Sequence, residues 1–180
     1  KVETELLSIN RYSRPGRKLK TVRAIVIHWV ANPGSTPERN RNYFENRKRG
    51  NDGFGSAHEI IGINGERLVC IPENEMAYHV GSKKYTKRAL IKLSSYPNDC
   101  TYGIELCHKD WTGEFSEATL NSAEHRCAEL CFEYDLDPIE DIWTHNGVVG
   151  WKDCPRWFVK NPKDFEKFKE RVKEIVMGKK

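Results

Sequence analysis

Residues 22–29 read Val22-Arg23-Ala24-Ile25-Val26-Ile27-His28-Trp29, a run dominated by apolar and β-branched side chains. The turn-forming sequence Asn32-Pro33-Gly34 comes shortly after it. Near-continuous apolar runs of this length, bounded by turn residues, are typical of strands buried on both faces of a sheet. We therefore predict a central strand here, with His28 close to its end.

Strands and helices alternate along the rest of the chain. Asn64-Gly65 separates two apolar runs, residues 57–63 and 66–71, and predicts a tight hairpin because both residues accept positive φ. Capping residues followed by apolar positions at helical spacing predict helices that begin at residues 36, 116 and 161, the first ending near residue 48. Further strands are expected at residues 102–107 and 141–144. This pattern predicts an α/β fold, a central mixed β-sheet flanked by α-helices.

The length of 180 residues is usual for one domain. We expect residues 1–180 to form that single domain, with residues 1–20 as a polar, basic arm laid over it. Five Trp, seven Tyr and seven Phe supply the bulk of a packed core and exclude a disordered chain. The longest uncharged apolar stretch, residues 24–31, is far shorter than the ~20 residues that span a membrane, so we expect no membrane insertion. A net charge of +4 does not by itself indicate nucleic-acid binding, and none is expected.

The six cysteines permit 15 disulfide pairings by count alone. Cys127 and Cys131 lie four residues apart in a helical pattern, and a domain with this core does not need covalent cross-links. We expect most of the cysteines to be reduced and buried. Cys154 is the exception, because its neighbourhood suggests a metal ligand.

Three residues are candidate metal ligands. His145 follows the short strand at 141–144, and Cys154 comes nine residues later in a loop with two glycines. Neutral imidazole and thiolate are preferred donors for zinc, but two protein ligands are too few. His28, at the end of the central strand, is the best-placed third ligand. Three ligands with one open position are typical of a catalytic zinc, whereas structural sites use four.

A zinc hydrolase also needs a base and a cation that stabilises the oxyanion. Glu105 lies in an apolar strand run and, by alternation, shares a face with Gly103 and Cys107. Lys152 precedes Cys154 by two residues and belongs to the same loop. Each residue also has a simpler interpretation, since a strand carboxylate and a loop lysine are often just solvated.

Five motifs follow one another along the chain, at residues 25–33, 56–58, 77–81, 103–106 and 144–155. Together and in this order they resemble those of the zinc-dependent N-acetylmuramoyl-L-alanine amidases of type 2. That family shares its fold with peptidoglycan recognition proteins. Residues 10–16 also look like the entry segment of phage endolysin and prophage autolysin members, and the resemblance covers roughly residues 8 to 158.

The resemblance implies one zinc ion per chain, with His28, His145 and Cys154 at the ligand positions. It implies hydrolysis of the amide bond between the lactyl group of N-acetylmuramic acid and L-alanine in bacterial peptidoglycan, which lyses the cell wall. Glu105 matches the catalytic glutamate, which takes the proton of the attacking water and returns it to the departing amine. Lys152 matches the lysine that stabilises the transition state.

Two further residues are expected to bind substrate. His79 aligns with a groove histidine that contacts substrate in some relatives. Trp151, between the zinc ligands in sequence, is suspected of stacking on a sugar. One departure from the family pattern is Ala57, because some members have a catalytic Tyr there; with Glu105 present, we expect the glutamate to be the base.

The basic residues of the first helix have two interpretations. They form a solvated helix face, or they attract an anionic wall polymer. They are Arg39, Arg41, Arg47, Lys48 and Arg49.

Two other functions compete with the amidase. The first is a non-catalytic peptidoglycan-binding module of the same fold, and the second is a zinc peptidase that cuts within the stem peptide. Peptidoglycan is the expected partner, and the domain is expected to be a monomer. We expect synthesis in the cytoplasm of a bacterial host and action on the wall, with secretion if the protein is an autolysin. Endolysins of this kind often carry a C-terminal wall-binding module, so the 180 residues would then be the catalytic part of a longer chain.

Overall fold

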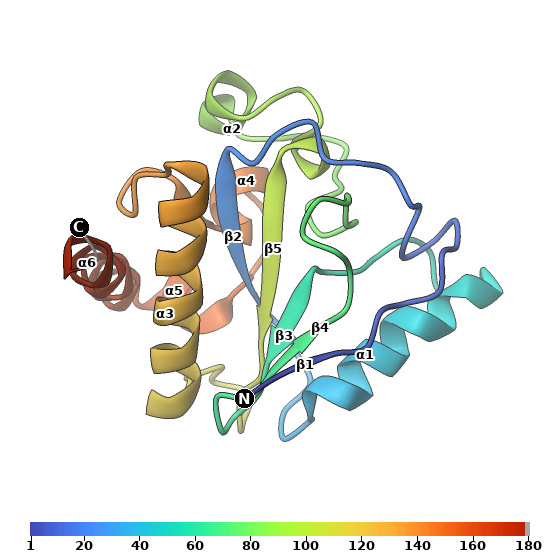
Figure 1. The fold of residues 1–180 in the computed structure, drawn as a ribbon, viewed down its shortest axis with the longest axis horizontal. Coiled ribbons are helices and arrows are strands. Elements are labelled where there is room, and N and C mark those ends of the chain that lie inside the picture. Colours follow the sequence, from blue (N-terminus) through green and yellow to red (C-terminus); the bar gives the residue numbers. More distant parts are fainter. Residues whose placement is uncertain (179–180) are drawn as a thin grey trace.

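The computed structural model describes residues 1–178, so the last two residues of the expected domain lie outside it. Within this range, one mixed sheet contains six strands in the order β1-β4-β3-β5-β2-β6 (Figure 1). The predicted central strand is confirmed as β2 (Ala24–Trp29), whose six residues are all buried. It lies between two parallel neighbours, β5 (Thr101–Leu106) and β6 (Ile142–Thr144).

The predicted hairpin forms, but its turn differs from the expected one, because Gly65 has a positive φ and Asn64 does not. β3 (Glu59–Ile61) and β4 (Arg67–Val69) pair antiparallel, and Gly65 in the turn between them has a φ of 83°. β3 then pairs in parallel with β5, which makes the sheet mixed. The first residues of the expected arm form an additional edge strand, β1 (Val2–Thr4), parallel to β4.

Helices cover both faces of the sheet (Figure 1). α3 (Glu117–Tyr134) and α6 (Pro162–Gly178) pack together on one face, accompanied by the short α5 (Arg156–Lys160). α1 (Pro37–Asn46), α2 (Lys87–Lys92) and α4 (His145–Val149) lie on the other side. Among the helices of residues 1–178, none has the length and apolar character that a membrane crossing requires.

The helix boundaries follow from local capping. Thr36 accepts a hydrogen bond from the backbone N–H of Arg39, so α1 begins at Pro37 as expected. α1 ends at Asn46, two residues before the expected position, because the chain tightens into a 3-10 turn, η1 (Arg47–Arg49). A second such turn, η2 (Pro97–Asp99), precedes β5. All six cysteines are buried and free, which confirms the prediction of reduced thiols.

The two faces of the sheet differ in a way that positions the site. On the α3 and α6 face, one continuous apolar cluster includes Ile25 and Ile27 of β2 and Ile104 of β5. On the opposite face the apolar side chains form two separate clusters, one beneath α2 and α4 and one beneath α1. β5 runs between these clusters and presents Thr101, Gly103 and Glu105 to that face. A polar strip therefore divides the core on this side.

Candidate active site

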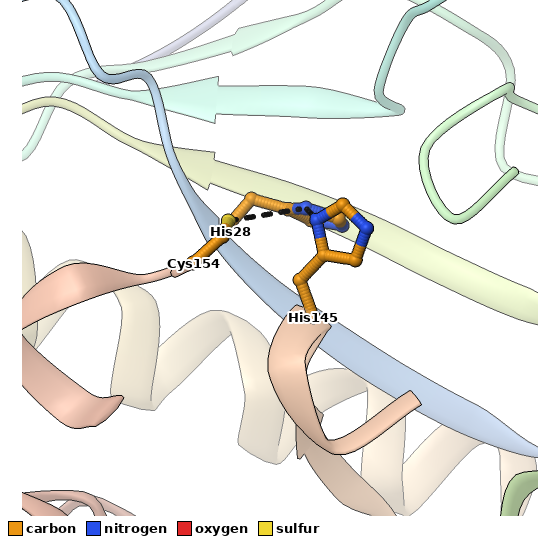
Figure 2. Close-up of side chains that lie close together, drawn as sticks. All are labelled: His28, His145 and Cys154. Atoms are coloured by element: carbon orange, nitrogen blue, oxygen red, sulfur yellow. Dashed lines mark hydrogen bonds between the residues drawn. The ribbon is translucent and has the colours of Figure 1, made fainter. Parts of the chain in front are cut away.

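His28, His145 and Cys154 meet on the polar side of the sheet, although they are far apart in sequence (Figure 2). His28 lies on β2, His145 is the first residue of α4, and Cys154 follows α4. Nδ1 of His28 is 3.1 Å from Nδ1 of His145 and 3.7 Å from Sγ of Cys154. The three ligand atoms lie within 4.8 Å of one another, so the structure brings together the three predicted metal ligands.

The donor set fits zinc in chemistry and in spacing. Zinc–nitrogen and zinc–sulfur bonds of about 2.0 and 2.3 Å in a tetrahedron place two nitrogens about 3.3 Å apart, and nitrogen and sulfur about 3.5 Å apart. The Nδ1–Nδ1 distance of 3.1 Å and the Nδ1–Sγ distance of 3.7 Å are close to these values. Three protein donors leave a fourth position open, as in catalytic sites.

The segment from His145 to Cys154 is not the continuous loop that the sequence suggested. Thr144 Oγ1 accepts a hydrogen bond from the backbone N–H of Gly147 and caps α4, so His145 stands at the start of a helix. The backbone N–H of Asn146, in the first turn of α4, donates to the carbonyl of Cys154 at 2.9 Å. This bond folds the chain back and places the thiol beside the two imidazoles.

Burial keeps both imidazoles in the form that binds metal. It lowers the pKa of His28 well below the usual range and that of His145 to about 4, and the nearby Lys152 adds to both shifts. Neutral imidazole is therefore the stable form at neutral pH, as a metal ligand requires. Burial raises the pKa of the Cys154 thiol, whereas a hydrogen bond from the backbone N–H of Trp29 and the charge of Lys152 act in the opposite direction.

Glu105 lies on the same face of the sheet as His28, to which it is the register partner on β5. Burial raises the pKa of its carboxyl to about 8, and the cations of Lys152 and Arg47 oppose that shift. Its Oε2 is buried and has no hydrogen-bond partner within residues 1–178. A carboxyl with a pKa near neutrality and a free oxygen in a cavity is suited to proton transfer.

Lys152, Glu105 and the three ligands all line one cavity of about 680 Å³. His79 lines it too, and its ring contacts His28. Trp151 is not among the lining residues. Trp151 is 55% exposed, and its indole N–H donates to Ser82 Oγ at 3.0 Å.

Several lining residues were not found from the sequence. Aromatic rings form much of the wall, and nothing in their spacing marks them as a group, because they come from separate segments of the chain. Asn98, between α2 and β5, likewise gave no signal. The aromatic residues are Tyr43, Phe54, Tyr78 and Tyr96.

The basic stretch of the first helix does not form one surface. Arg47 turns into the cavity wall, where its guanidinium donates to Tyr43 Oη at 3.2 Å. Arg41 instead donates to the backbone carbonyls of Glu5 and Leu6 and holds the N-terminal segment against α1. Arg39, Lys48 and Arg49 remain exposed, so the stretch divides into a cavity residue, a structural residue and three solvated ones. Ala57 is fully buried in the apolar cluster beneath α1 and offers no polar group to the site.

A mixed sheet that carries a His-His-Cys cluster, a buried carboxyl and a lysine in one cavity has the organisation of a metal-dependent hydrolase. The sequence profile described as N-acetylmuramoyl-L-alanine amidase matches residues 18–157, most of the chain. The chain belongs to this family.

Individual relatives agree with this assignment. The chain is 36% identical to the N-acetylmuramoyl-L-alanine amidase BlyA of Bacillus subtilis (strain 168), over 96% of this chain and 47% of BlyA. It is 32% identical to the N-acetylmuramoyl-L-alanine amidase CwlL of Bacillus licheniformis, over 99% of this chain and 48% of CwlL. The chain thus spans about half the length of the curated relatives it matches. The solved PlyG catalytic domain aligns with a TM-score of 0.75 at 18% identity, over 98% of this chain and 95% of that domain, which supports the fold.

Proposed function

We propose that this chain is a catalytic domain that hydrolyses the amide bond between N-acetylmuramic acid and L-alanine in bacterial peptidoglycan, with one zinc ion per chain. Family membership supports the reaction class. The observation that carries the proposal is the meeting, in one cavity, of three zinc-type donors with a carboxyl and a lysine.

His28, His145 and Cys154 would hold the metal. When bound, zinc supplies Lewis-acid chemistry, because it lowers the pKa of a water from 15.7 to about 7 and polarises a carbonyl. Glu105 takes the proton of the attacking water and passes it to the departing amine of L-alanine. Lys152 Nζ supplies a positive charge that stabilises the oxyanion formed from the carbonyl oxygen of the substrate.

The walls of the cavity suit a substrate with a sugar and a peptide. Tyr43, Phe54 and Tyr78 supply flat apolar surfaces on the side of α1. Trp151 does not line the cavity, but its exposed ring lies 5.4 Å from Lys152 Nζ, and we propose that it stacks on the sugar. We infer that the domain acts as a monomer on the bacterial wall.

Zinc analysis combined with mass spectrometry of peptidoglycan digests tests the proposal. We expect about one zinc per chain and the release of stem peptides that begin with L-alanine. His28→Ala should lose zinc and product together, whereas His125→Ala, on the exposed side of α3, should keep both.

Other outcomes would identify the competing functions. Wall binding with no cleavage and no zinc would favour the non-catalytic binding module. Cleavage at a bond inside the stem peptide would identify a zinc peptidase. Either result would reject the proposed reaction.

A further inference from the structure

His79 contacts the side of His28 that faces away from the metal ligands. It lies between β4 and α2 and is 7% exposed. Its Nδ1 is 2.9 Å from Nε2 of His28, and the two rings meet edge to face. Nδ1 of His28 is the nitrogen that faces His145 and Cys154. The contact therefore joins His79 to the outer nitrogen of a metal ligand.

The direction of the hydrogen bond between His79 and His28 follows from the other end of the network, where Thr101 contacts the carbonyl of Pro97. Thr101 Oγ1 lies 2.7 Å from the carbonyl of Pro97, which can only accept, so the single hydroxyl proton of Thr101 points there. Nε2 of His79 lies 2.9 Å from Thr101 Oγ1 and 3.3 Å from the Thr101 carbonyl, so it must donate. In a neutral ring the other nitrogen is then an acceptor. His79 Nδ1 thus accepts from Nε2–H of His28.

We propose that His79 is a positioning residue that accepts the Nε2–H of His28 and thereby keeps the lone pair of His28 Nδ1 directed at the metal. This inference rests on the proposed zinc site and assigns His79 a role other than substrate contact. Groups that hydrogen-bond the outer nitrogen of a ligating histidine fix its tautomer and ring orientation. In this protein the group is the neutral imidazole of His79. Its Nε2–H donates to Thr101 Oγ1, and the Thr101 hydroxyl donates to the carbonyl of Pro97.

Two neighbours hold His79 in place. The side-chain Oδ1 of the buried Asn98 accepts hydrogen bonds from the backbone N–H groups of His79 and Val80, at 3.1 and 2.9 Å. On β5, a Cβ at Gly103 would lie 2.5 Å from Cγ of His79 and 2.6 Å from its Nδ1, which is an overlap. The absence of a side chain at Gly103 is therefore what lets the imidazole rest on the strand.

Zinc affinity, measured by competition with a chelator of known strength, tests the role without an activity assay. His79→Leu keeps the bulk and removes the acceptor, and we expect it to bind zinc about 10–100-fold more weakly. His79→Asn can place Oδ1 near the position of Nδ1 and should retain affinity within a few-fold of the wild type. Gly103→Ala should weaken binding in the same way, because it displaces the ring without removing it.

Nitrogen-15 NMR of the histidines in the zinc-loaded wild type provides a second test that needs no variant to fold. We expect His28 to carry its proton on Nε2; a proton on Nδ1 would overturn the proposal. Equal zinc affinity of folded His79→Leu and the wild type would overturn the positioning role alone. If His28→Ala bound zinc as well as the wild type, the proposed metal centre itself would be wrong.

Discussion

His28 and Glu105 are register partners on two neighbouring parallel strands, β2 and β5. Partners in register point to the same face, and neighbouring strands lie about 4.8 Å apart. The backbone hydrogen bonds of the sheet, rather than a loop, therefore hold a metal ligand and a carboxyl side by side. Because that spacing is independent of the side chains, substitutions at Glu105 should alter the chemistry and leave the metal centre intact.

Glu105→Gln should remove the proton-transfer group and preserve the shape of the side chain. We expect the rate of stem-peptide release to fall by about 10²–10⁴-fold, the usual contribution of a general base, while the zinc content stays that of the wild type. Product analysis and metal analysis on the same preparation check this. Glu174→Gln, exposed on α6, is the matched control and should keep full activity. Loss of zinc from Glu105→Gln would contradict the independence of the two groups.

In the metal-free protein, the buried carboxyl of Glu105 should make the free energy of unfolding depend on pH. The pKa of Glu105 is raised from 4.5 to about 8, so the folded state holds a proton that the unfolded chain has released. Between these two pH values the folded state binds more protons at Glu105, so the contribution of this group to the free energy of unfolding falls as the pH rises.

Glu105→Gln cannot titrate and should lack this contribution. In urea unfolding with a chelator present, the variant should gain stability relative to the wild type from pH 5 to pH 8 and then no further. The Glu174→Gln protein should follow the wild type across the range. A stability difference between Glu105→Gln and the wild type that does not change with pH would show that Glu105 is not protonated in the fold.

Lys152→Met should lose the charge at the oxyanion and keep most of the side-chain volume. Removing one such stabilising group typically costs about 10²–10³-fold in kcat. We expect a loss of this size with KM little changed, measured on a soluble muramyl peptide. Lys84→Met, at an exposed position before α2, serves as control. A variant that loses its zinc instead would assign Lys152 a structural role.

Buried histidines should make the metal-free protein sensitive to acid. Burial lowers the pKa of His28, His58, His79 and His145, to about 4 for His58 and His145. These rings are neutral in the fold but become charged in the unfolded chain below about pH 6.5. Their contribution to stability is complete above that pH and is lost as the pH falls toward 4.

In the Glu105→Gln background, which removes the opposing titration of Glu105, urea midpoints of the metal-free protein measured at pH 7, 6 and 5 should therefore decrease. His58→Gln removes one titrating ring and should make the decrease shallower. His125→Gln should leave it unchanged, since His125 lies on the exposed side of α3. A midpoint independent of pH would mean that the rings are charged in the folded protein.

Local signals in the sequence were sufficient to predict the central strand of the sheet and the three residues that the structure brings together as a candidate metal site. The strand at β2 was predictable because its apolar run is unbroken, and the hairpin because Asn64-Gly65 admits positive φ. The ligands were predictable because His28 and His145 each stand at the end of a strand. Glu105 was placed on the correct face by alternation alone.

Other features depend on contacts that no local pattern encodes. Residues 145–149 include Gly147 and two valines, which are poor helix formers, so α4 exists because Thr144 caps it and Gly150 ends it. β1 exists because β4 offers an edge for pairing. The ring of His79 reaches His28 only across the bare backbone of Gly103, and that approach cannot be read from the spacing of either residue.

The three proposed metal ligands come from distant parts of the sequence. His28 is separated from His145 by 117 positions and from Cys154 by 126. A bound ion would act as a removable cross-link between the beginning and the end of the domain. During synthesis on a ribosome, no complete ligand set can exist until residue 154 has emerged. The proposed metal site can therefore be complete only after all six strands of the described sheet have been synthesised.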